Sequence, residues 1–215
     1  MTPQQESIVQ AAQQAGEDPA YALAVAERES NFNPRAHSSK TIHGMYQMRG
    51  DLRQKYGAGD SDDPGDQARG WMKSLPDIRN DMKSVLGRDP TDQEVYLGHH
   101  YGAKRAARTL TMDPSTPTDA VFTPQEMAAN PHFARAGTIG NLNASITGDI
   151  GKRMDRFGGV VPPHSTEPSD LSAFGEAVDQ SGAGIPAGTD NGPATSQTTA
   201  AATSAPDLSQ FGEAA

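Results

Sequence analysis

The sequence predicts a mainly α-helical domain followed by an extended, low-complexity C-terminal tail. Three capping boxes, in which a threonine is followed three residues later by a glutamine or glutamate, mark helix starts at Thr2, Thr91 and Thr123. Behind these starts, apolar residues recur every three or four positions, which is the period of a helix. After Arg156 the chain has seven acidic residues, no Lys or Arg, and much Pro, Gly, Ser, Thr and Ala. Such a segment cannot bury enough apolar surface to offset the loss of chain entropy on folding.

The composition is that of one ordinary domain with an appendage. Only 34% of the 215 residues are hydrophobic, and the mean hydropathy of -0.66 is low for one compact domain of this length. The net charge of -9 argues against a nucleic-acid partner, because nucleic-acid-binding proteins carry a basic patch or stripe. The chain has no cysteine, so a disulfide framework and thiol chemistry are excluded.

The start of the chain predicts neither export nor membrane insertion. Residues 1–18 lack a basic start and a continuous apolar segment, so we expect no secretory signal peptide. No apolar run approaches the roughly 20 residues that a membrane-spanning helix needs, so we expect no membrane span.

Two helices are expected before residue 35. The first begins at Thr2 and is stopped by Gly16. The second begins at Asp18, which precedes a proline in the same way. Pro34 disfavours helical geometry in the residue before it, so the second helix should end near Asn31.

Glu29 falls in the last turn of this second helix, behind the apolar run Tyr21–Ala26. The negative end of the helix dipole disfavours a carboxylate there, and partial burial raises the pKa of a carboxyl group. Both effects favour the protonated form, which is the state that a general acid needs.

The middle of the chain mixes loop and helix. Residues 35–60 are rich in Gly, Ser and His without a clear period, so loop and short turns are expected. A helix should open at Asp63 and close at Gly87. Pro76 lies inside it and predicts a break or kink before Ile78.

Three further helices complete the expected domain. One should run from Thr91 through Leu110, because its apolar residues share one face. A short helix follows the third capping box and should end at Asn130–Pro131. The last is expected over residues 142–157, with Gly158 and Gly159 as its stop. We therefore place one domain at residues 1–157 and the tail at residues 158–215.

One segment of the tail occurs twice. Asp170–Ala177 and Asp207–Ala214 are identical at seven of eight positions. They are either a duplicated low-complexity fragment or two copies of a docking motif whose Leu and Phe insert into a partner. We favour docking, because two linked weak motifs gain from a raised effective concentration.

Three motifs carry a resemblance to a known family. The segments Glu29–Ala36 (ESNFNPRA), Gly44–Gln47 (GMYQ) and Tyr96–Ala103 (YLGHHYGA) resemble, in order and spacing, the lytic transglycosylase (goose-type lysozyme-like) superfamily, in its phage version. The resemblance covers about residues 5–157 and implies a lysozyme-like α+β fold with little sheet. The chain departs from the common pattern at Met45, which replaces Leu, and at His99, which replaces Tyr.

The resemblance also implies an activity and its residues. It implies cleavage of peptidoglycan glycan strands between MurNAc and GlcNAc, with Glu29 as the catalytic residue. We expect no cofactor, and we expect no metal, because His99 and His100 are adjacent on a helix and cannot both point at one ion. The resemblance further implies substrate-binding residues in all three motifs: Ser30, Gly44, Met45, Tyr46, Gln47, His99 and Tyr101. Other roles stay open: Ser30 as a helix cap, and Tyr46 and Gln47 in packing and loop hydrogen bonds. Tyr96 and Trp71 are expected in the core.

A single acid is chemically sufficient for this cleavage. Most glycosidases use two carboxylates. Here Glu27 lies two residues from Glu29 and so faces another side of the helix. The route that the resemblance implies needs one acid, because the C6 hydroxyl of the muramic acid is the nucleophile and a 1,6-anhydro product forms.

A wall-degrading enzyme without an export signal needs another route to its substrate. We expect it to be carried in a phage virion, to act in the bacterial periplasm and cell wall, and to bind other virion proteins through the tail. The alternatives are a structural or ejected virion protein whose lysozyme-like domain is inactive, and a free endolysin.

Overall fold

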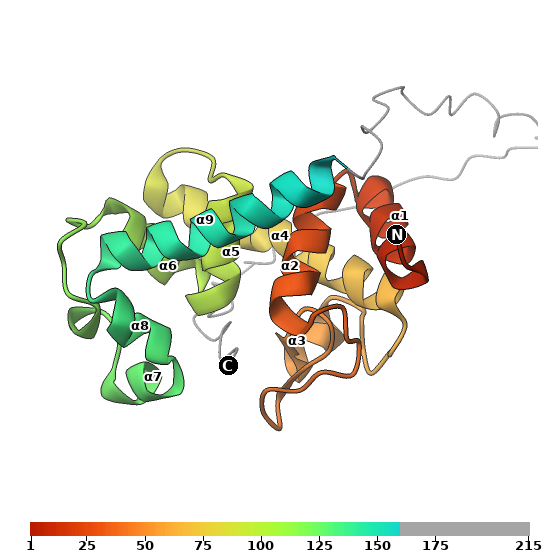
Figure 1. Cartoon of the computed structure of the whole chain (residues 1–215), viewed down its shortest axis with the longest axis horizontal. Helices are drawn as coiled ribbons and strands as arrows, with labels where there is room; N and C mark the ends of the chain where they lie inside the picture. Colours follow the sequence, from red (N-terminus) through yellow and green to blue (C-terminus); the bar gives the residue numbers. More distant parts are fainter. Residues whose placement is uncertain (160–215) are drawn as a thin grey trace, which may run out of the picture. The chain divides into compact units, whose positions relative to one another are not determined.

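The computed structural model describes residues 1–159, which form a mainly helical domain and confirm the expected fold class (Figure 1). The tail with its two repeated segments, apart from Gly158 and Gly159, lies outside the described residues. The helices are α1 (Pro3–Ala15), α2 (Pro19–Ser30), α3 (Gly50–Lys55), α4 (Pro64–Leu86), α5 (Asp92–Tyr101), α6 (Ala103–Thr111), α7 (Pro124–Ala129), α8 (Pro131–Ala136) and α9 (Ile139–Gly158). The strands β1 (Ile42–His43) and β2 (Met48–Arg49) form an antiparallel hairpin, and a 3-10 turn spans Thr118–Ala120.

The expected helix ends are confirmed where they rest on capping chemistry. All three capping boxes form, so each threonine side chain accepts from a backbone N–H while the Gln or Glu side chain accepts from the threonine N–H. Asn31 closes α2 in the left-handed conformation, with φ 51°. Gly16 and Gly87 close α1 and α4 in the same conformation.

Of the break or kink expected at Pro76, the break does not occur, because α4 runs unbroken through this residue. A proline inside a helix removes one hydrogen bond and costs about 3 kcal/mol. Helix α4 buries large apolar side chains on both sides of the proline, among them Trp71, Leu75, Ile78 and Met82. Each contributes about 1.5–3 kcal/mol on burial, so packing outweighs the lost bond.

The single helix expected from Thr91 to Leu110 is also wrong, because Gly102 divides it into α5 and α6. Gly102 has φ 89° and ψ 133°, a conformation outside the helical region. Helix α5 packs tightly on α4, since a Cβ added at Gly98 would lie 2.7 Å from Cγ2 of Ile78. The bend at Gly102 lets α6 pack on α4 as well.

Residues 35–60 contain more regular structure than expected. Ile42 pairs with Arg49 and His43 with Met48 in the hairpin, and helix α3 follows directly. Helix α8, which begins at Pro131, was likewise not expected. The hairpin strands, α3 and α8 are each too short to leave a clear period in the sequence.

Helix α2 supplies the centre of the core. Its residues Tyr21–Ala26 are buried, and the helix packs against α1 on one side and α9 on another. The expected place of Trp71 in the core is confirmed. Its ring centre lies 4.5 Å from that of Tyr46, on which it stacks, and 5.4 Å from that of Tyr21. None of the helices in residues 1–159 is long and apolar enough to cross a membrane.

Candidate active site

Glu29 lies in the last turn of α2 with its side chain directed at α5. Only 2% of that side chain is exposed. Its Oε1 accepts a hydrogen bond from the Tyr96 hydroxyl and lies 3.9 Å from Nε2 of His99. Directly after the helix, Asn31 and Phe32 both take positive φ, which turns the chain away and leaves the carboxyl group at the helix end.

The surroundings of Glu29 shift its pKa in the direction expected from the sequence. Burial raises the pKa to about 7, and the hydrogen bond from Tyr96 and the charge of Arg28 partly oppose this rise. No other carboxylate of the described residues contributes to the shift. A carboxyl group with such a pKa can both give and accept a proton near neutral pH.

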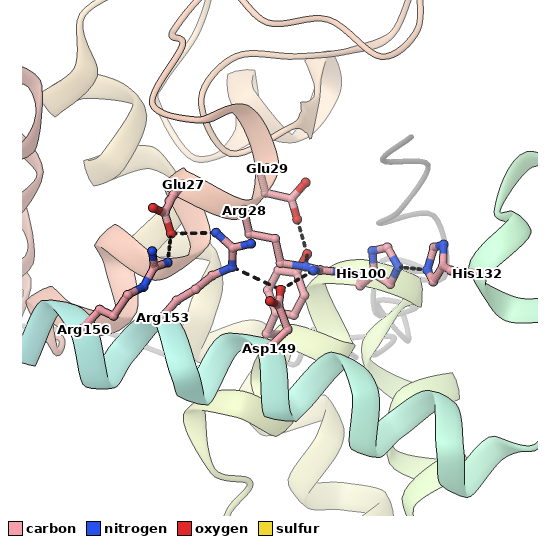
Figure 2. A network of polar contacts seen from close by, with 9 residues as sticks. Glu27, Arg28, Glu29, His100, His132, Asp149, Arg153 and Arg156 are labelled. Atoms are coloured by element: carbon pink, nitrogen blue, oxygen red, sulfur yellow. Dashed lines mark hydrogen bonds and ion pairs between the residues drawn. The ribbon is translucent and has the colours of Figure 1, made fainter. Parts of the chain in front are cut away.

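Glu27 faces a different side of α2 and is engaged by α9. Its carboxylate accepts from Nη1 of Arg153 at 2.6 Å and also pairs with Arg156. Figure 2 shows both arginines meeting Glu27 while Glu29 points away from them. The structure thus separates the two carboxylates, one ion-paired and one held by a phenol.

Tyr96 is buried as expected, but the sequence did not indicate its part in the site. Its hydroxyl donates to Glu29 and accepts from Nε of Arg28 at 2.8 Å. Burial raises the pKa of Tyr96 well above its ordinary value. The available signal was helical spacing, since Tyr96 lies three residues before His99 and so shares its face of α5.

Ser30 links the first two motifs. Its hydroxyl donates to the backbone oxygens of Met45 at 2.9 Å and Ala26 at 3.2 Å, and accepts from the backbone N–H of Asn33 at 3.1 Å. Ser30 therefore closes the helix and also holds the loop that carries Gly44–Gln47 against it.

Position 44 requires glycine both because its φ is positive and because neighbouring side chains leave no room for a Cβ. It has φ 87°, and an added Cβ would lie 2.0 Å from Nη1 of Arg53 and 2.6 Å from Oε1 of Gln67. That same Gln67 oxygen accepts from the backbone N–H of Met45. The loop thus rests directly on α3 and α4.

The side chains of Met45, Tyr46 and Gln47 point into the protein. Met45 is fully buried, and the Tyr46 hydroxyl donates to the backbone oxygen of Ala22 at 3.3 Å. The Gln47 amide donates to the backbone oxygens of Gly44 at 2.7 Å and Ala36 at 3.2 Å. In this structure the three side chains stabilise the loop, and their contact with a substrate stays a prediction.

The third motif divides between two places. His99 is buried beside Glu29, and burial lowers its pKa to about 4, so it is uncharged at neutral pH. The Tyr101 hydroxyl instead bonds to Asn143 on α9 and to Thr109 on α6. The structure therefore brings His99, but not Tyr101, to Glu29.

His100 faces away from the carboxyl group toward α8. Its ring stacks on Tyr96 at 5.9 Å, and its Nε2 lies 3.2 Å from Nε2 of His132 (Figure 2). Within residues 1–159 no three His, Asp or Glu side chains are grouped so that they could hold a metal ion.

A comparison with protein families places the first two motifs in a known domain. Residues 6–66 match the family model described as the transglycosylase SLT domain. The match confirms the resemblance to the lytic transglycosylase and lysozyme-like superfamily, and it ends in the first turn of α4, before the third motif. No curated protein matches the chain.

Proposed function

We propose, from the transglycosylase SLT domain that residues 6–66 match, that this protein is a peptidoglycan lytic transglycosylase with Glu29 as its acid and base. The observation that carries the proposal is the state of Glu29. It is a buried carboxyl group with a pKa of about 7, held by Tyr96 and set apart from the ion-paired Glu27.

The reaction needs one proton donor that later accepts a proton. Protonated Glu29 gives its proton to the oxygen that links MurNAc C1 to GlcNAc C4, and the bond between C1 and this oxygen breaks. The C6 hydroxyl of the same muramic acid attacks C1 and gives its proton to the Glu29 carboxylate. A 1,6-anhydro end forms, no water is consumed, and Glu29 regains its starting state.

The test is digestion of purified peptidoglycan by the wild type and by Glu29→Gln, with the released fragments identified by mass spectrometry. We expect anhydro fragments from the wild type and a loss of at least about 100-fold in the variant. Equal release by both, or no release by the wild type, contradicts the proposal. Reducing ends in place of anhydro ends indicate a hydrolase.

We also propose that the enzyme is carried in a phage particle and held there by its tail. The support is the repeated segment at 170–177 and 207–214, whose two copies suit a repeated site in a larger assembly. Deletion of residues 165–215 should leave peptidoglycan cleavage intact and abolish incorporation into particles. Normal incorporation of the shortened chain contradicts the docking role.

A further inference from the structure

Arg28 is fixed between α5 and α9. Its Nε donates to the Tyr96 hydroxyl at 2.8 Å, and its Nη1 donates to Asp149. Its guanidinium carbon lies 5.3 Å from the centre of the Tyr96 ring. Asp149 is held in turn by Nε of Arg153 at 3.1 Å (Figure 2). The side chain of Arg28 therefore has one well-defined orientation.

The hydrogen bonds of the Tyr96 hydroxyl follow from its single proton. A guanidinium group only donates, whereas a phenol can accept and has one proton to give. Because Arg28 donates to the Tyr96 oxygen, the Tyr96 proton is available for Oε1 of Glu29. The hydroxyl keeps that proton at neutral pH, because burial raises the pKa of Tyr96.

We propose that Arg28 is a positioning residue that acts through Tyr96, directing the Tyr96 proton to Oε1 of Glu29 and leaving Oε2 as the atom that carries the acid's proton. Oε1 accepts from Tyr96 in both protonation states, so the proton of the neutral acid sits on Oε2. The role of Oε2 in transfer rests on the proposed function, whereas the coupling of Arg28 to Glu29 does not.

Few charged groups face Glu29. Tyr96 and His99 approach it from α5, and His99 is neutral at pH 7 because burial lowers its pKa to about 4. Arg28 belongs to the same helix turn and supplies the positive charge that acts on Glu29. Arg28 pairs with Asp149, and Arg153 and Arg156 pair with Glu27, so these ion pairs leave Glu29 to the hydrogen bond from Tyr96.

The test measures the pKa of Glu29 by carbon NMR of the full chain, in the wild type, Arg28→Gln, Tyr96→Phe and the double variant. We expect each single change to raise the pKa by about one unit. The double change should raise it by clearly less than the sum, because either single change already breaks the same chain of hydrogen bonds. An unchanged pKa in Arg28→Gln, or additive shifts, overturns the proposal.

Arg105→Gln is the matched control. Arg105 donates to Glu126, lies 5.6 Å from the Phe122 ring centre, and has a side chain 29% exposed, against 23% for Arg28. We expect no change in the pKa of Glu29, and a shift equal to that of Arg28→Gln overturns the proposal. Arg28→Met is measured beside Arg28→Gln, since Met is unbranched and, unlike the Gln amide, has no N–H to donate to Tyr96.

Activity provides a separate readout. In Arg28→Gln the loss of peptidoglycan cleavage at high pH should move upward by the same amount as the Glu29 pKa. If the wild type does not cleave peptidoglycan, the proposed function fails, whereas the NMR titration still decides whether Arg28 acts on Glu29 through Tyr96.

Discussion

The hydroxyl of Tyr96 donates a hydrogen bond to Oε1 of Glu29, so that residues 67 positions apart in the sequence form one polar unit. Burial would by itself raise the pKa of Glu29 further, and the bond from Tyr96 opposes that rise. Two opposing effects, burial and the hydrogen bond from Tyr96, therefore set the pKa of Glu29 at about 7, and each can be altered by substitution.

Tyr96→Phe should move the pH dependence of cleavage upward. The first step needs protonated Glu29, so the rate falls as the pH rises through the pKa of Glu29. Removing the Tyr96 hydrogen bond raises that pKa above about 7, and turnover at the optimum should fall roughly tenfold because the carboxyl group is less well positioned. The measurement is turnover against pH on peptidoglycan, and an unchanged midpoint on the basic side contradicts the assigned role of Tyr96.

Glu29→Gln should stabilise the folded protein at high pH. The pKa of Glu29 is raised from 4.5 to about 7 on folding, so its favourable contribution is complete below pH 4.5 and is lost as the pH rises through 7. By linkage, the free energy of unfolding that the ionisation of Glu29 removes is about 3 kcal/mol at pH 8. Urea unfolding at pH 4 and pH 8 should show the variant gaining stability over the wild type only at pH 8. A gain that is the same at both pH values refutes the raised pKa.

Glu27→Gln is the complementary change and should affect stability rather than chemistry. It removes the ion pairs with Arg153 and Arg156, which join α2 to α9. We expect a loss of about 1 kcal/mol in the free energy of unfolding, because these pairs are partly solvated, and cleavage within about threefold of the wild type. A loss of activity as large as that of Glu29→Gln would contradict the assignment of catalysis to Glu29 rather than Glu27.

Gly44→Ala should destabilise the loop more than its backbone angle alone requires. An alanine at positive φ costs about 1 kcal/mol, and here its Cβ would also overlap Arg53 and Gln67. We expect urea unfolding to show that Gly44→Ala loses about 3 kcal/mol in the free energy of unfolding. Gly16→Ala is the control, since Gly16 also has positive φ but an added Cβ meets nothing within 4 Å. Equal losses in the two variants exclude the overlap as a cause.

Local chemistry in the sequence determined the helix ends and the position of the acid. A threonine cap, a Gly in the left-handed conformation or a Pro after a helix acts within a few residues, so Thr2, Thr91, Thr123 and the end of α2 near Asn31 could be predicted without a fold. The same reasoning placed Glu29 in the last turn of a buried helix and gave the direction of its pKa shift.

Tertiary packing decided what depends on contacts distant in the sequence. Helix α4 continues through Pro76 because the side chains on either side of it are buried, and Gly102 divides the expected helix where α5 and α6 both pack on α4. Tyr96 could be expected in the core, but its bond to Glu29 depends on where α5 lies against α2. Such contacts gain their free energy only after the chain has closed long loops, so no local pattern in the sequence records them.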